Sequence, residues 1–360
     1  DLYYFTGTDQ DAHLWVPAEG KPLLMVRKSV ERALADALIG EIVPLNGLSE
    51  IPELIRKTTG KRPQRLGLEM DVIPAALYLQ YLKLFTGAEP VDVSRIVRRI
   101  RMIKTDYEIS RIRKAAAVGD ALMELIPGFL RQSTDETELA VMAEAFYRKN
   151  GHPGVTRTRA FNAEATYGHI LAGPNGAVPS GSFGPTAGAG LGPWYSQGAG
   201  RGPIRPYEPV MVDYTACCDG YIADQTRVFS LGGLPDELAR ACKVMREIQD
   251  AVAAEGKPGT PAAELYVAAL RMAEEAGLGD GFMGHPEAVP FLGHGVGLEL
   301  DEWPIITDRA TFVLEQGMTL ALEPKVVFPG RGVVGVENNF LVGPECMERL
   351  NRFPDRPLVV

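Results

Sequence analysis

The feature that most constrains this chain of 360 residues is a pair of similar segments in its C-terminal half. Each segment contains two apolar runs that we expect to pair as a β-hairpin, with one carboxylate inside each run. The first hairpin carries Asp213 and Asp224 on either side of an Asp-Gly turn, and the second carries Glu323 and Glu337 on either side of a Pro-Gly turn. A charged carboxylate inside an apolar strand is unfavourable unless a partner or a cation compensates it.

The four carboxylates point to a metal centre. If the two hairpins face each other, the acids meet, and their mutual repulsion favours bound cations. His294, in Gly293-His-Gly-Val-Gly, adds an imidazole in a segment whose glycines let the backbone approach closely. Such a set suits Mn²⁺, Co²⁺, Fe²⁺ or Zn²⁺ in a bridged pair about 3.5 Å apart. We therefore expect two divalent ions, preferably manganese, bound by Asp213, Asp224, His294, Glu323 and Glu337.

Composition excludes several classes of protein. Acidic residues outnumber basic ones by 46 to 37, and the resulting charge of −9 argues against a nucleic-acid-binding protein. No apolar run is long enough to cross a membrane. The four cysteines are too few for a disulfide framework, so we expect a cytoplasmic protein. Because the chain starts without a signal peptide or an initiator Met, we expect it to begin inside a longer gene product.

Two domains are expected, and both mix helices with strands, as in α/β or α+β folds. Residues 1–104 alternate short apolar strands with helices and contain no recognisable chemistry. Thr105 and Glu108 then have the pattern of a capping box, which predicts the start of a second domain over 105–360. In this domain a helix pair followed by apolar strands occurs twice, so we expect a pseudo-symmetric fold. Another capping box is expected over 133–136.

At these residues the sequence resembles the pita-bread-fold metallopeptidases, which comprise aminopeptidase P, prolidase, methionine aminopeptidase and the metal-free creatinases. Residues 1–7 resemble part of the family's N-terminal domain, and residues 101–108 resemble the start of its catalytic domain. The five candidate ligands match the family's metal motif one by one, since the second Asp follows the first by eleven positions and the second Glu follows the first by fourteen. The resemblance implies a creatinase-like N-terminal domain, a pita-bread catalytic domain and a homodimer. It also implies hydrolysis of a small peptide or amide, most like that of a Xaa-Pro aminopeptidase or dipeptidase.

The sequence departs from the family where the peptidases carry auxiliary catalytic groups. Pro290 and Asp301 stand where prolidases and aminopeptidases P have histidines, four residues before and seven residues after the ligand His. Ser180 is the nearest match to a third auxiliary His, and Gly335 stands where many members have Arg. A Gly-rich stretch over 181–202 has no counterpart of that length in the simple peptidases, and we expect it to shape the pocket.

The resemblance also implies roles for individual residues. Glu323 would be the general base and would pass a proton to the leaving nitrogen. His169 is expected to face the substrate and to replace a missing histidine as a donor to the developing oxyanion. Asp301 and Ser180 are expected to contact the substrate, whereas His152 is expected at the surface.

Two other functions fit the same residues. The missing histidines favour a metal-dependent hydrolase or lyase that acts on a non-peptide small molecule. The second alternative is a binding protein on a catalytically retired peptidase fold, against which the retained metal ligands argue.

Overall fold

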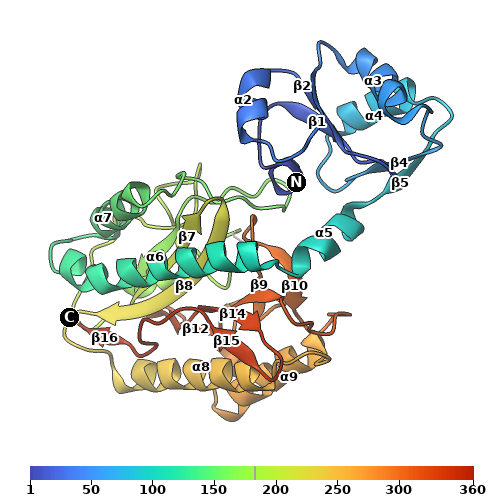
Figure 1. The fold of residues 1–360 in the computed structure, drawn as a ribbon. Coiled ribbons are helices and arrows are strands. Elements are labelled where there is room, and N and C mark those ends of the chain that lie inside the picture. Colours follow the sequence, from blue (N-terminus) through green and yellow to red (C-terminus); the bar gives the residue numbers. More distant parts are fainter. Residues whose placement is uncertain (182–183) are drawn as a thin grey trace. The chain divides into compact units, whose positions relative to one another are not determined.

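The structure is a computed structural model that describes residues 1–181 and 184–360 (Figure 1). The chain divides into two compact units, residues 1–97 and residues 98–360. The division falls within helix α5 (Ser94–Met102), a few residues before the expected domain boundary at 104.

The first unit alternates strands and helices. Strands β1, β2 and β3 form one sheet, with β1–β2 antiparallel and β2–β3 parallel, while β4 and β5 form a parallel pair. Strand β2 is buried along its whole length, and its side chains pack with those of α3 in a small hydrophobic core. The elements are α1 (Leu2–Thr6), β1 (Ala12–Trp15), β2 (Leu23–Val26), α2 (Val30–Asp36), β3 (Ile42–Pro44), η1 (Leu48–Glu50), α3 (Ile51–Thr59), β4 (Arg65–Leu68), α4 (Ala75–Leu84) and β5 (Glu89–Asp92).

The second unit contains the repeated order that the sequence predicts. A helix pair and its strands come first, and a second helix pair with further strands follows. The first set is α6 (Asp106–Leu130), α7 (Glu136–Lys149), β6 (Gly168–Ala172), η2 (Gly173–Ala177), β7 (Val210–Cys218) and β8 (Tyr221–Ser230). The second set is α8 (Asp236–Glu255), α9 (Ala262–Glu275), η3 (Gly279–Gly281), β9 (Gly293–Gly295), β10 (Glu302–Ile306), β11 (Thr319–Leu322), β12 (Lys325–Phe328), β13 (Gly332–Gly335), β14 (Asn338–Val342), β15 (Met347–Arg349) and β16 (Leu358–Val359).

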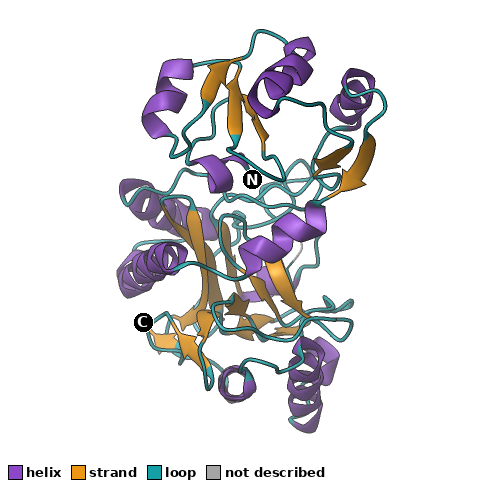
Figure 2. Cartoon of the chain, turned by 45° about the vertical axis from the view of Figure 1, so that its right-hand side comes forward, coloured by secondary structure: helices purple, strands orange, loops and turns teal. Residues whose placement is uncertain are grey.

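The strands of the second unit lie between helices (Figure 2). One sheet has the order β16-β8-β7-β6, a second has the order β10-β9-β11-β14-β15, and β12 pairs with β13. Helix α6 packs on β7 and β8, whereas α8 packs on β13 and β15 and α9 packs on β10 (Figure 1). A bridge between Thr226 and Glu337 joins the two sheets, because each residue's backbone N–H donates to the other's carbonyl oxygen. The inner strands of the two sheets, β8 on one side and β11 and β14 on the other, are therefore in direct contact.

The first predicted hairpin is confirmed. Strands β7 and β8 pair antiparallel from Val210 to Phe229 around a two-residue turn. Asp219 and Gly220 both have positive φ, 51° and 85°, as a tight hairpin turn of the primed type requires. Asp213 lies opposite Thr226, so Asp213 and Asp224 are diagonal neighbours on one face of the sheet.

The second predicted hairpin is present, but both of its arms are interrupted. One arm is β11 and β12, separated by Glu323-Pro324, and the other is β13 and β14, separated by Val336-Glu337. Pro324 has no N–H to donate to a neighbouring strand, so the ladder breaks there. Strand β12 pairs with β13, and β11 pairs with β14. The two glutamates therefore stand at the breaks and not inside continuous strands.

One predicted helix cap is confirmed and another is wrong. Thr105 and Glu108 form the capping box, since the Thr105 N–H donates to Glu108 Oε2 (2.8 Å) and the Glu108 N–H donates to Thr105 Oγ1 (3.4 Å). The box expected over 133–136 does not form, because Asp135 caps α7 by accepting from the Glu138 N–H (2.9 Å). The Glu136 side chain instead points into the protein and is fully buried.

In the described part of the chain, no helix combines the length and the apolar character that crossing a membrane requires.

Candidate metal centre

The site lies where the two sheets of the second unit meet. Asp213 on β7 and Asp224 on β8 reach it from one sheet, and His294 on β9 reaches it from the other. Glu323 and Glu337 stand at the interruptions of the second hairpin, and the bridge from Thr226 holds Glu337 next to β8. The Thr226 hydroxyl also donates to Glu337 Oε2 (2.7 Å). The structure thus gathers all five predicted ligands in one region.

The glycines beside His294 are required by close packing. Strand β9 is the middle strand between β10 and β11, and His294 pairs with Ala321 on one side and Ile305 on the other. A Cβ on Gly293 would lie 2.2 Å from the Ala321 carbonyl oxygen, and one on Gly295 would lie 2.3 Å from the Trp303 carbonyl oxygen. Neither distance is sterically possible, so only Gly fits at either position.

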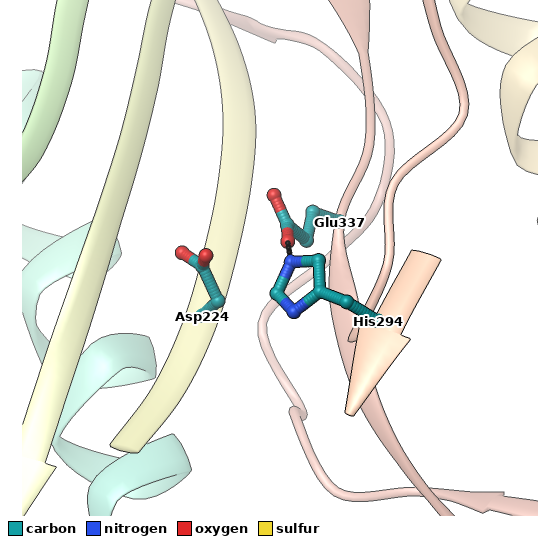
Figure 3. A group of neighbouring side chains, drawn as sticks. All are labelled: Asp224, His294 and Glu337. Carbon is teal, nitrogen blue, oxygen red and sulfur yellow. Dashed lines mark ion pairs between the residues drawn. The ribbon is translucent and has the colours of Figure 1, made fainter. Parts of the chain in front are cut away.

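Asp224, His294 and Glu337 form a set that can hold a metal ion. One ligand atom from each lies within 4.8 Å of the ligand atoms of the other two. Figure 3 shows the His294 ring facing the Glu337 carboxylate, with the Asp224 side chain beside them, and the three residues come from separate segments of the chain. Within the described residues, Glu337 Oε1 is buried and has no hydrogen-bond partner. An acceptor left this way is unfavourable, and a cation at this point would satisfy it.

The same cluster contains a cation that was not predicted from the sequence, the side chain of Lys325. Its Nζ lies 2.6 Å from Glu323 Oε2, 2.9 Å from Glu337 Oε2 and 3.0 Å from Asp213 Oδ2. The Lys325 side chain is only 1% exposed. The signal was available, because a lysine inside the apolar run Leu322-Glu-Pro-Lys-Val-Val is as unfavourable alone as the acids are.

The charges of the cluster shift the pKa values of its members. Burial opposes the charge on Lys325, but Asp213, Glu323 and Glu337 raise the pKa of the lysine well above its ordinary value. Burial likewise opposes the charge on Asp213, yet Lys325 keeps the pKa of that carboxyl below its usual range. Burial, and then repulsion from Asp213, raises the pKa of Asp224 well above its ordinary value. One ammonium is therefore too little positive charge for the four acids.

Burial and the charge of Asp224 also raise the pKa of Glu337 well above its ordinary value. Asp224 and Glu337 are thus the acids with the least compensation, and both belong to the set that can hold an ion. His294 Nε2 lies 3.5 Å from Glu323 Oε1 and 3.9 Å from Glu337 Oε1. A divalent ion suits this position for two reasons. Carboxylate oxygens and an imidazole are suitable ligands, and Asp224 and Glu337 lack a compensating positive charge.

His169 lies beside the cluster. It is on β6, directly opposite Asp213 on β7, and its Nε2 is 3.3 Å from Gln197 Oε1. Burial lowers its pKa, while the negative charge of Asp213 acts in the opposite direction. Gln197 belongs to the Gly-rich stretch, and its side-chain amide also donates to the Glu164 carbonyl oxygen (2.9 Å). The described part of that stretch therefore reaches the neighbourhood of the site.

Asp301 and Ser180 are the other two residues expected to contact the substrate. Both oxygens of Asp301 accept backbone N–H groups, from Arg159 (2.8 Å) and from Ala160 (3.1 Å). Ser180 is half-buried in the segment that follows η2. Its role and that of Asp301 toward a substrate stay predictions. Part of the Gly-rich stretch, residues 182–183, lies outside the described residues.

A buried ion-pair cluster next to Asp301 was not foreseen. Glu302 binds Arg101 Nη2 (2.5 Å) through one oxygen and Lys104 Nζ (2.9 Å) through the other. Burial opposes the charge on Glu302, but Lys104 and Arg101 keep its pKa below the usual range. The basic segment before Thr105 is thus an anchor for β10. Its acidic partner is about 200 residues away along the chain, so neighbouring residues give no signal of the pairing.

The expectation that His152 is at the surface is wrong. His152 is only 4% exposed and lies between Tyr147, with ring centroids 5.8 Å apart, and Tyr167, at 4.5 Å. Its Nδ1 accepts the Gly154 N–H (3.0 Å). Burial lowers the pKa of His152 to about 4. The helix end at Asn150-Gly151 is typical of a surface position, but the rings of Tyr147, from the last turn of α7, and Tyr167, from a separate segment, cover His152.

Comparison with known proteins gives consistent matches. A family model described as metallopeptidase family M24 matches residues 110–344, and one described as the creatinase/prolidase N-terminal domain matches residues 1–103. A Xaa-Pro dipeptidase of Lactobacillus delbrueckii subsp. lactis is 29% identical over 348 residues, which cover 94% of this chain and 86% of the relative.

Solved structures match over the whole length. A Xaa-Pro dipeptidase from Bacillus anthracis superposes with a TM-score of 0.83 at 27% identity, covering 100% of this chain and 92% of the other. A prolidase from Pyrococcus furiosus has a TM-score of 0.79 at 25% identity, with 98% and 94% covered. The expected fold class is confirmed, with a creatinase-like N-terminal domain followed by a pseudo-symmetric pita-bread domain.

Proposed function

The chain belongs to metallopeptidase family M24, and from that premise we propose that it is a metal-dependent hydrolase of small peptides that contain a Xaa-Pro bond. The observation that carries this proposal is the set of Asp224, His294 and Glu337, which can hold an ion beside two further acids. A bound divalent ion polarises a peptide carbonyl and makes water a better nucleophile at neutral pH.

Glu323 is the proposed general base. It is 4% exposed, and its two oxygens face different partners: Oε1 faces His294 Nε2 at 3.5 Å and Oε2 faces Lys325 Nζ at 2.6 Å. This arrangement supports the proposal, because the carboxylate is fixed beside a metal ligand. A positioned carboxylate can take a proton from water and pass it to the leaving nitrogen.

His169 is the proposed hydrogen-bond donor to the developing oxyanion. Two observations support this role: strand pairing places His169 across from Asp213, and the contact of its Nε2 with Gln197 orients the ring. The proposed substrate contacts of Asp301 and Ser180 come from the sequence. For Asp301, the two backbone N–H groups that it accepts fix the carboxylate in one orientation.

We further propose manganese as the ion, a homodimer as the assembly and the cytoplasm as the location. Hard carboxylate oxygens with one imidazole support manganese among the divalent metals. The described cysteines are free, which fits a reducing compartment.

A non-peptide substrate remains the second candidate, and one observation favours it. Pro290 has no side-chain donor, and the Asp301 carboxylate already accepts two backbone N–H groups, so neither position offers the imidazole that stabilises a peptide oxyanion. For this reason we expect Xaa-Pro turnover to be slow.

A substrate screen tests the proposal. Protein loaded with Mn²⁺ is incubated with Xaa-Pro dipeptides and Xaa-Pro-Yaa tripeptides, and with Xaa-Ala analogues as matched controls. The expected result is Mn²⁺-dependent release of the N-terminal residue from Xaa-Pro substrates, which is lost in Asp224→Asn. Fully metal-loaded protein that cleaves none of these peptides would contradict the peptidase function and favour a non-peptide substrate.

A further inference from the structure

We propose that the ammonium group of Lys325 takes the place of one of the two cations that this cluster of acids would otherwise bind, so that the protein holds one divalent ion and one built-in cation. The inference deepens the proposed function and rests on it for the nature of the centre.

The ammonium is fully coordinated by the acids. A lysine ammonium has three N–H donors and no acceptor. Here it has three carboxylate oxygens within hydrogen-bond distance, one each from Glu323 (2.6 Å), Glu337 (2.9 Å) and Asp213 (3.0 Å). These bonds use every donor of the group. A metal ion bound through the same three oxygens would have to displace it.

Close packing at Gly335 leaves room for the stem of this lysine. Lys325 begins β12 directly after Pro324, and its pairing partner on β13 is Gly335. A Cβ on Gly335 would lie 2.6 Å from Lys325 Cγ, 2.6 Å from the Pro324 carbonyl oxygen and 2.8 Å from Lys325 Cα. The two backbone atoms alone require Gly at this position, and the absence of a side chain there also leaves space for the lysine stem.

The oxygens that the ammonium occupies, and not the charge sum, set the number of ions that fit beside the lysine. The cluster contains four carboxylates, on Asp213, Asp224, Glu323 and Glu337. With the ammonium, one divalent ion leaves a single negative charge and two divalent ions leave a single positive charge, so the sum is equally close to neutral in both cases. A second ion would need oxygens of Glu323, Glu337 and Asp213 that already accept from the ammonium. The single ion is therefore favoured as long as the lysine holds these oxygens.

The ligands that Lys325 does not use are sufficient for that single ion. Neither Asp224 nor His294 bonds to the lysine, and Glu337 bonds to it through Oε2 only. The other oxygen, Glu337 Oε1, is the buried atom without a hydrogen-bond partner among the described residues. The lysine thus divides the predicted five-ligand set into a cation position that it fills and an ion position that it leaves open.

Metal stoichiometry tests the inference without any assay of activity. Stripped wild-type protein is reloaded with excess MnCl₂, passed over a desalting column and analysed for manganese and protein by mass spectrometry. The expected ratio is one Mn²⁺ per chain. Lys325→Ala removes the ammonium, and its expected ratio is two. Lys243→Ala is the matched control, because Lys243 is exposed on α8, and its expected ratio is one.

Two further variants keep the test decisive if Lys325→Ala fails to fold. Asp213 holds the ammonium and not the ion in this account, so Asp213→Asn should retain one Mn²⁺ per chain. Asp224 is a ligand of the ion, so Asp224→Asn should retain none. If two ions bind to the wild type, Asp213→Asn is expected to lose one of them.

A wild-type ratio other than one, or a folded Lys325→Ala that takes up no more Mn²⁺ than the wild type, would overturn the inference. The proposed function is tested independently of this inference. Protein that binds one Mn²⁺ and cleaves no Xaa-Pro peptide leaves this inference intact, whereas protein that binds two and cleaves them retains the function and loses the inference.

Discussion

Lys325 and the acids around it are each unfavourable when buried alone and are stable only together. The ammonium is 1% exposed and keeps the pKa of Asp213 low, while Asp224 and Glu337 lack compensation and have raised pKa values. Removing one partner of such a buried pair typically destabilises a protein by about 3–5 kcal/mol. Substituting one charged residue of the centre is therefore expected to lower the stability of the fold as well as the activity.

Glu323→Gln tests the general base. The amide keeps one oxygen that can accept from Lys325 Nζ, so the fold should persist, but it cannot take up a proton. We expect kcat for the best Xaa-Pro substrate to fall on the order of 10²-fold or more. Glu274→Gln, at an exposed position near the end of α9, is the matched control. Activity within a few fold of the wild type would assign the base to another group.

His152 makes stability depend on pH. Its pKa in the folded protein is about 4, below the ordinary 6.5, so between these values the unfolded chain binds a proton that the folded protein does not. The free energy of unfolding must therefore fall as the pH is lowered from 6.5 to about 4. In His152→Asn, whose amide oxygen can still accept from the Gly154 N–H, this contribution is absent.

The measurement is the Tm of both proteins at pH 7.5 and pH 4.5. We expect the loss of Tm on acidification to be smaller in His152→Asn than in the wild type. Equal losses in the two proteins would mean that His152 titrates normally in the folded state.

At the scale of elements, one buried carboxylate fixes the Gly-rich stretch to its surroundings. Glu136, the first residue of α7, is 0% exposed. Its Oε1 accepts the Ala172 N–H (2.6 Å), and its Oε2 accepts the Gly200 N–H (2.7 Å). The Asn175 side-chain amide donates to both oxygens. One side chain thus links the start of α7, the end of β6 and the Gly-rich stretch.

Glu136→Gln should destabilise the protein although it changes few atoms. The NH₂ group of the glutamine would face the N–H of Ala172 or Gly200, where the carboxylate has an oxygen that accepts it. One buried hydrogen bond would therefore be lost. We expect a loss of about 1–3 kcal/mol in the free energy of unfolding, measured by urea denaturation. Glu275→Gln, on the exposed end of α9, should change the stability by less than about 0.5 kcal/mol. Equal stabilities of the two variants would exclude this role for Glu136.

At the scale of the whole molecule, the sequence predicts those features whose signal is local. The capping box at Thr105 and the Asp-Gly hairpin turn have short patterns with a direct physical reason, and the structure has both. The five candidate ligands could be found because each charged group interrupts an apolar run or stands between glycines.

The features that the sequence does not predict depend on contacts between distant segments. Glu302 meets Arg101 and Lys104 about 200 residues away, and Glu136 meets Gly200. The burial of His152 depends in part on Tyr167, which comes from a separate segment. Lys325, in contrast, could have been predicted from the sequence. A lysine inside an apolar run is as unfavourable without a partner as the buried acids are.

The central claim, a metal centre with one ion beside a built-in ammonium, is tested most directly by a crystal structure of the Mn²⁺-loaded protein with anomalous data at the manganese edge. The account predicts a single anomalous peak coordinated by Asp224, His294 and Glu337, with Lys325 Nζ still bonded to Asp213 and Glu323. No peak at these residues, or a peak at the position of the ammonium with Lys325 turned away, would contradict it.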